Sequence, residues 1–117
     1  MQLLRVRGGL YSEERNLIEF LNNEFVRVRL QYKLEPESGE HYPFVHVDVH
    51  KWSKELYLSL IDSLYDLLEE HDIDELFAEI PAENLMNQKF AIKFGFSPIG
   101  ETSEGILYEF KKAEEEV

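Results

Sequence analysis

The chain has 117 residues and no cysteine, and 44% of its residues are hydrophobic and 13% aromatic. This length and composition fit one folded domain and exclude disulfides, thiolate nucleophiles and cysteine-bound zinc. The net charge of −12 lies almost wholly in residues 61–117, which carry four basic and fifteen acidic residues. We therefore expect no nucleic-acid or anionic-membrane partner, and we expect a partner bound through charge to be basic.

The start of the chain has no signal-peptide core, and no apolar run approaches the roughly 20 residues that span a bilayer. The sequence therefore predicts a cytoplasmic protein.

Residues 1–50 are predicted to form three strands and one helix. A short strand, Leu3–Arg7, ends at a glycine pair, and apolar residues at helical spacing predict a helix from about Ser12 to Glu24. Alternating apolar and polar residues predict strands at Val26–Leu34 and Phe44–His50, joined by a polar loop over 35–40. The valines of the second of these strands share one face, and the other face carries His46, Asp48 and His50.

Residues 51–117 are predicted to alternate helices and strands and to end in a hairpin. A long amphipathic helix, Trp52–His71, has Ser53 as its N-cap, and a short strand follows at Glu75–Ile80. A second helix begins at Asn84, and a hairpin over 97–111 turns near Glu104 and Gly105, before an acidic tail at about 112–117. The order β-α-β-β-α-β-α-β-β predicts a mixed sheet in which the strands joined by the long helix are parallel.

The run from Asn84 to Phe96 carries the most specific motif, an Asn-capped helix that ends at a Gly-Phe pair. Its spacing resembles the closing motif of the GNAT superfamily of acyl-CoA-dependent acetyltransferases, Asn-x-x-Ala-x-x-Leu-Tyr-x-x-x-Gly-Phe. Asn87 stands in place of the small residue and Ala91 in place of the tyrosine. The resemblance implies an α/β (α+β) fold with a mixed, mostly antiparallel central sheet, flanking helices and one parallel strand pair that splays apart to admit the pantetheine of acetyl-CoA.

The resemblance also implies a function, the transfer of an acetyl group from acetyl-CoA to an amine of a small molecule or protein. Asp48 or His50 would act as the base, and either Tyr108 or Tyr57 would supply the acid that Ala91 cannot. The residues that would contact the cofactor are Val49 through its backbone, Lys51, Ser53 and Lys54 near the pyrophosphate, and Asn84 at the cofactor arm.

Two departures from the family pattern open an alternative function. The turn that should cradle the pyrophosphate, His50 to Tyr57, contains no glycine, and Ala91 removes the usual acid. A non-catalytic GNAT-fold binding or structural module is the alternative, and short chains of this kind are similar to phage-encoded proteins, which implies a virion or assembly role in the host cytoplasm. An acidic decoy for a basic protein is a third interpretation, based on charge alone.

The polar side chains of the predicted strands also have simpler interpretations. His46, Asp48 and His50 would be polar because their face is solvated, and they do not suit one metal ion because His46 and His50 lie about 13 Å apart along a strand, at roughly 3.3 Å per residue. Arginines alternate at Arg5 and Arg7 and again at Arg27 and Arg29. If the two strands pair, these four would form a basic face that binds an anion, docks on another copy, or lies in solvent.

Overall fold

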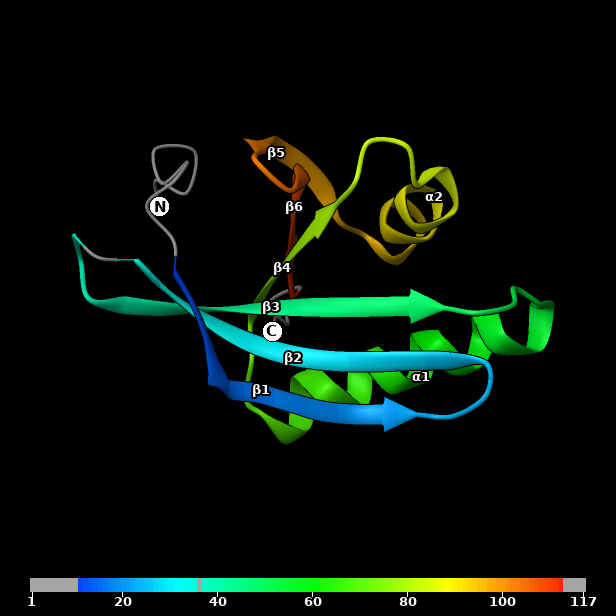
Figure 1. Ribbon diagram of the computed structural model, residues 1–117. Helices are drawn as coiled ribbons and strands as arrows, with labels where there is room; N and C mark the ends of the chain where they lie inside the picture. Colours follow the sequence, from blue (N-terminus) through cyan, green and yellow to red (C-terminus); the bar gives the residue numbers. More distant parts are fainter. Residues whose placement is uncertain (1–10, 36, 113–117) are drawn as a thin grey trace, which may run out of the picture.

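The computed structural model describes residues 11–35 and 37–112, which form one mixed sheet and two helices on one of its faces (Figure 1). The sheet order is β1-β2-β3-β4-β6-β5. Its elements are β1 (Tyr11–Asn22), β2 (Val26–Glu35), β3 (Glu40–Val49), α1 (Lys54–Glu70), β4 (Glu75–Ile80), α2 (Leu85–Phe94), β5 (Ser97–Thr102) and β6 (Gly105–Lys111). The predicted fold class is confirmed. The predicted strand Leu3–Arg7 and most of the acidic tail lie outside the described residues.

The predicted helix at Ser12–Glu24 is wrong, because this segment is strand β1, paired antiparallel with β2. The register shifts between Glu19 and Leu21, so Phe20 is the extra residue of a β-bulge. Phe20 and its neighbour Leu21 consequently both pack against the core. The bulge places two successive apolar residues on the core side, and this produced the helix-like spacing.

The C-terminal half follows the prediction closely. The Asn84 side chain accepts a hydrogen bond from the backbone N–H of Asn87 at 3.2 Å and caps α2. Gly95 ends the helix with φ of 122°, and a Cβ there would lie 3.2 Å from the ring of Phe110. β5 and β6 form the expected hairpin, in which Gly105 has φ of 144°.

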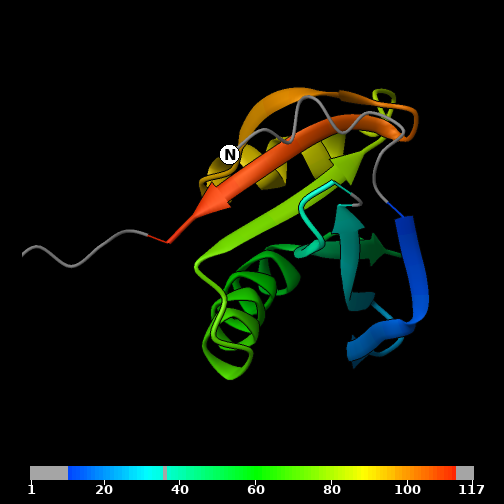
Figure 2. The same cartoon turned by 90° about the vertical axis from the view of Figure 1, so that its left-hand side faces the viewer.

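The two halves of the sheet meet at a narrow seam between β3 and β4. These strands are parallel, as predicted for a pair joined by α1, but their register contains a single residue pair, Phe44 with Phe77. Figures 1 and 2 show that the β4-β6-β5 half is turned away from β1-β2-β3. The seam is therefore closed at Phe44 and opens toward the end of β3.

Both helices cover the same face of the sheet and touch each other through aromatic rings. Tyr57 of α1 packs edge-on against Phe90 of α2 at a centroid distance of 5.4 Å, and Tyr65 lies 5.0 Å from Phe94. The opposite face carries a smaller cluster of buried side chains, Phe44, Phe77 and Leu107. The core is thus divided by the sheet, and the seam residue Phe44 belongs to the smaller part.

A buried ion pair crosses the seam on the face away from the helices. Lys33 of β2 pairs with Glu79 of β4, passing over β3, and their side chains are only 10% and 8% exposed. The Lys33 ammonium also lies 4.6 Å from the centroid of the Phe44 ring, at cation–π distance. The pair therefore adds a side-chain bridge between the two halves of the sheet beside their one register pair.

We expect Lys33→Met to lower the free energy of unfolding by about 3–5 kcal/mol, because it leaves the Glu79 carboxylate buried without its cation. Chemical denaturation monitored by circular dichroism measures this loss. The double variant Lys33→Met/Glu79→Met is the control, and it should recover most of the stability. A loss below about 1 kcal/mol, as for an exposed pair, would contradict the structural role of the ion pair.

Candidate ligand cleft between β3 and β4

A cavity of about 250 Å³ lies where β3 and β4 diverge. Strand alternation gives it two chemically different sides. The helix-bearing side is mostly apolar and includes Val45, Val47, Ala78, Phe90, Ala91 and Phe96. The opposite side is polar and includes Arg29, His46, Asp48 and Glu79. The gap between the strands therefore connects an apolar pocket under α2 with a charged rim on the other face.

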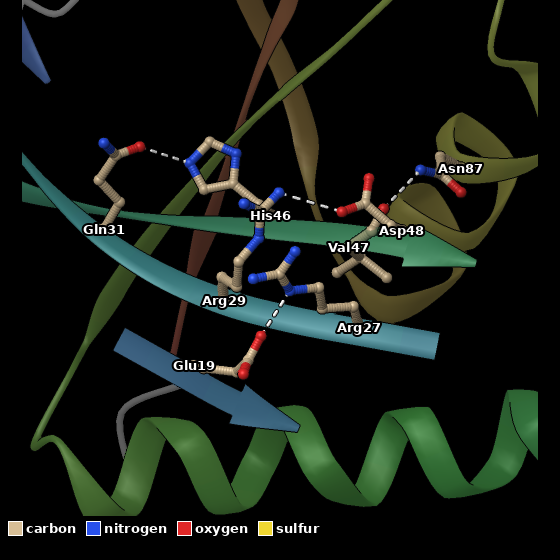
Figure 3. A network of polar contacts seen from close by, with 8 residues as sticks. All are labelled: Glu19, Arg27, Arg29, Gln31, His46, Val47, Asp48 and Asn87. Atoms are coloured by element: carbon tan, nitrogen blue, oxygen red, sulfur yellow. Dashed lines mark hydrogen bonds and ion pairs between the residues drawn. The ribbon is translucent and has the colours of Figure 1, made fainter. Parts of the chain in front are cut away.

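The side chain of Asn87 crosses this gap from α2 to β3. Its Nδ2 donates a hydrogen bond of 3.1 Å to the backbone carbonyl oxygen of Val47 (Figure 3). The Val47 carbonyl belongs to a part of β3 that has no register partner on β4. At this partly buried position Asn87 supplies the donor that a neighbouring strand would otherwise provide.

His46 is the imidazole that faces the cavity. Its Nε2 lies 2.7 Å from Oε1 of Gln31, and this oxygen accepts a hydrogen bond from the ring (Figure 3). Nε2 then carries the proton of the neutral ring, and Nδ1 keeps its lone pair. Burial lowers the pKa of His46 below its ordinary value of 6.5, and the positive charges of Lys33 and Arg29 lower it further. The ring is therefore neutral at pH 7.

The charged rim of the cavity is already ion-paired. Arg29 Nη2 donates to Asp48 Oδ2 at 3.0 Å, and on the same face Arg27 pairs with Glu19 at 2.5 Å (Figure 3). Nε of Arg29 is buried and has no hydrogen-bond partner in the described part of the chain. Arg27 and Arg29 therefore do not present the free basic face that their alternation suggested, and the other two arginines, Arg5 and Arg7, lie outside the described residues.

Of the residues predicted for catalysis, only Asp48 lines the cavity. His50 lies beyond the end of β3, where it is exposed and its backbone N–H donates to Phe25 at 2.8 Å. The Tyr108 hydroxyl donates to Oε1 of Gln88 at 3.1 Å, and Tyr108 is not among the cavity residues. Burial raises the pKa of Tyr108, which keeps this hydroxyl protonated. The sequence analysis selected His50, whereas the structure places His46 at the cavity.

Of the residues predicted for cofactor binding, only Asn84 lines the cavity. The others lie apart from it: Val49 near the end of β3, and Lys51, Ser53 and Lys54 at the start of α1. Ser53 caps α1 as predicted, since its Oγ accepts the Leu56 N–H at 3.1 Å. It lines a separate cavity of about 390 Å³ between the β1–β2 turn and α1.

The residues around the cavity do not fit the arm of acetyl-CoA in this arrangement. Asn87 occupies the gap, and the Trp52 ring lies 5.8 Å from Phe90 and packs between the start of α1 and α2. No residue from the first turn of α1 lines the cavity. A cofactor held at that turn would therefore lie apart from the cavity lining.

The order of elements, the splayed parallel pair and the Asn-capped helix match a GNAT-like fold. No family model and no curated protein matches the sequence significantly. Among solved structures, the ribosomal-protein-S5-alanine acetyltransferase from Vibrio fischeri is similar, with a TM-score of 0.53 and 9% identity over 77% of this chain and 63% of that one. An uncharacterized protein from Bacillus halodurans has a TM-score of 0.53 and 18% identity, with 79% and 62% covered.

A third similar structure, AAC(6')-Ib in complex with Parmomycin and acetyl-CoA, has a TM-score of 0.50 and 15% identity over 75% of this chain and 66% of that one. The chain spans 62–66% of the length of these three proteins. Identities this low establish the fold and leave the activity open.

Residues 11–35 and 37–112 contain neither a candidate metal site nor a helix that could cross a membrane. No three acidic or histidine side chains there come together in a group that could hold a metal ion. Neither helix of the described chain is long and apolar enough to cross a membrane.

We expect the lowered pKa of His46 to make the protein less stable as the pH falls below about 6.5. In that range the unfolded chain binds a proton at His46 more readily than the folded chain does, so the free energy of unfolding decreases with decreasing pH. Urea denaturation between pH 5 and 7.5 measures this dependence for the wild type and for His46→Gln. The variant should show a shallower slope, and identical slopes would contradict the burial of a neutral imidazole.

Proposed function

We propose that this protein is a GNAT-fold binding module that does not transfer acetyl groups. The observation that carries this proposal is the hydrogen bond from Asn87 to the Val47 carbonyl, because it engages a β3 carbonyl at the gap that the family resemblance assigns to the cofactor arm. His46 is the imidazole that lines the cavity. A thioester bound elsewhere on the protein would therefore lie apart from this candidate base.

The remaining chemistry of the cavity supports the same proposal. Acetyl transfer to an amine needs a base for the amine and an acid for the leaving thiolate. Asp48 is held in an ion pair with Arg29, and the alanine at position 91 has no proton to give. The Tyr108 hydroxyl is bound to Gln88 and lies away from the cavity lining.

An amine acetyltransferase that uses acetyl-CoA is the second candidate function, and one observation favours it. The neutral imidazole of His46 lines the cavity with an unprotonated Nδ1, and such a group suits general base catalysis near pH 7. This candidate requires Asn87 to leave the gap before a thioester can enter.

The partner of the binding module is proposed to be a basic protein. α1 carries five exposed acidic side chains on its outer surface, Glu55, Asp62, Asp66, Glu69 and Glu70. Such a concentration of charge attracts a basic surface at low ionic strength and repels nucleic acid. A virion or assembly role, implied by the resemblance to phage-encoded chains, stays a prediction.

We expect acetyl-CoA at 1 mM to leave the melting temperature of the wild-type protein unchanged. A ligand present at 100 times its Kd would stabilise the folded state by about 2.7 kcal/mol, which a thermal-shift assay detects readily. Calorimetric titration gives an independent measurement. Saturable binding of acetyl-CoA, together with acetylation of an amine that His46→Gln abolishes, would replace the proposed function with the second candidate.

A further inference from the structure

We propose that the outer surface of α1 binds a basic amphipathic helix of a partner protein. The apolar side chains of that helix would lie on Leu58 and Tyr65, which together we call the α1 strip. Lys and Arg on one side of the partner helix would pair with a row of acids beside the strip. The inference rests on the proposed function and deepens it, because it names the kind of basic partner and the residues of α1 that contact it.

The α1 strip consists of large apolar side chains that the fold leaves in contact with solvent. Leu58 is 53% exposed and Tyr65 is 48% exposed, and the two lie seven residues apart along α1. Between them, Ile61 is half-buried and packs against the core. Apolar residues that recur after three and then four positions form the seam along which one helix packs on another. α1 therefore presents a short seam to a second helix.

One side of the α1 strip carries a row of acids at the same spacing. Glu55, Asp62 and Glu69 follow one another at intervals of seven residues, and all three are exposed. Asp62 is within about one helical turn of both Leu58 and Tyr65, so its carboxylate stands beside the apolar contact. In pairs of helices, charged residues that flank the apolar seam select the partner and its orientation. The partner helix would therefore carry Lys or Arg along the side that faces this row.

The other side of the α1 strip faces α2 and carries the opposite charge. The Lys93 ammonium of α2 lies 5.8 Å from the centroid of the Tyr57 ring of α1, and Lys89, one turn earlier on α2, is exposed. The acids thus lie away from α2 and the lysines lie toward it. Because Lys89 and Lys93 repel a basic side chain and the acids attract it, the basic side of the partner helix is expected to lie over α1.

A second copy of this chain suits the surface less well than a basic helix does. Each copy has a net charge of −12 and carries the same row of acids on α1, so long-range repulsion opposes the association of two copies. A basic helix instead gains attraction along the whole row. Charge complementarity therefore favours a basic partner over a dimer.

The test measures the binding of a fluorescein-labelled helical peptide by fluorescence anisotropy. The peptide has about three heptads, with Leu at positions a and d, Lys at b and e, and Gln elsewhere, and a matched peptide has Glu at b and e. At low ionic strength we expect saturable binding of the lysine peptide and no binding of the glutamate peptide. Leu58→Ser should weaken binding of the lysine peptide about tenfold because an apolar contact is lost, and Asp62→Lys should weaken it about tenfold because an attraction becomes a repulsion.

Two variants outside the α1 strip are the matched controls. Ile92→Ser removes a side chain of α2 that is 57% exposed, and Glu104→Lys makes the same change of charge at the exposed turn between β5 and β6. Both should bind the lysine peptide within about twofold of the wild type, because neither residue lies beside the strip. Circular dichroism checks that every variant is folded.

The remaining outcomes contradict the inference. If the wild type does not bind the lysine peptide, or if Leu58→Ser binds it equally well, no helix is held by the strip, and the proposed function still stands. Equal weakening by Glu104→Lys and Asp62→Lys would show that net charge alone attracts the peptide. A wild-type dimer in analytical ultracentrifugation that Leu58→Ser dissociates would make a second copy the occupant. Acetylation of an amine from acetyl-CoA would overturn the proposed function itself, independently of the peptide result.

Discussion

The narrow seam between β3 and β4 determines the rest of this structure. One backbone register pair at Phe44 and Phe77 joins the two halves of the sheet, and the Lys33–Glu79 ion pair adds a side-chain bridge above it. Because both charges are nearly excluded from water, each requires the other, and the bridge fixes where the strands stay together. Beyond that point the strands separate, and the cavity exists only because they do.

Where β3 and β4 separate, the backbone carbonyls of β3 need hydrogen-bond donors from elsewhere in the protein. A strand edge that is neither paired nor solvated leaves buried carbonyls without donors, and each such group costs about 1–3 kcal/mol. In this chain the donor for Val47 comes from Asn87, in the first turn of α2. The same contact joins α2 to β3 across the gap, so a feature that could serve ligand binding here contributes to the fold itself.

Local signals in the sequence were sufficient for some elements and insufficient for others. The Asn84 cap and the Gly95 exit are short-range patterns, and the structure reproduces both. The bulge at Phe20 is not visible locally, because it depends on which residues of β2 lie opposite, and it turned a strand into an apparent helix. The role of His50 was implied by the family resemblance, and strand alternation alone does not reveal that β3 ends at Val49, one residue before it. The departure from the motif at Asn87 is visible in the sequence. Its hydrogen-bond partner Val47 lies 40 residues away along the chain, so this contact could not be predicted without the fold.

The distribution of charge follows from the same pairing across strands. Three cations on the face away from the helices, Arg27, Arg29 and Lys33, each face an acid contributed by a neighbouring or next-nearest strand. These three cations are therefore neutralised within the sheet, whereas the acids of α1, Glu55, Asp62, Asp66, Glu69 and Glu70, are exposed. The proposed basic partner would therefore be attracted to the exposed acids on the outer surface of α1.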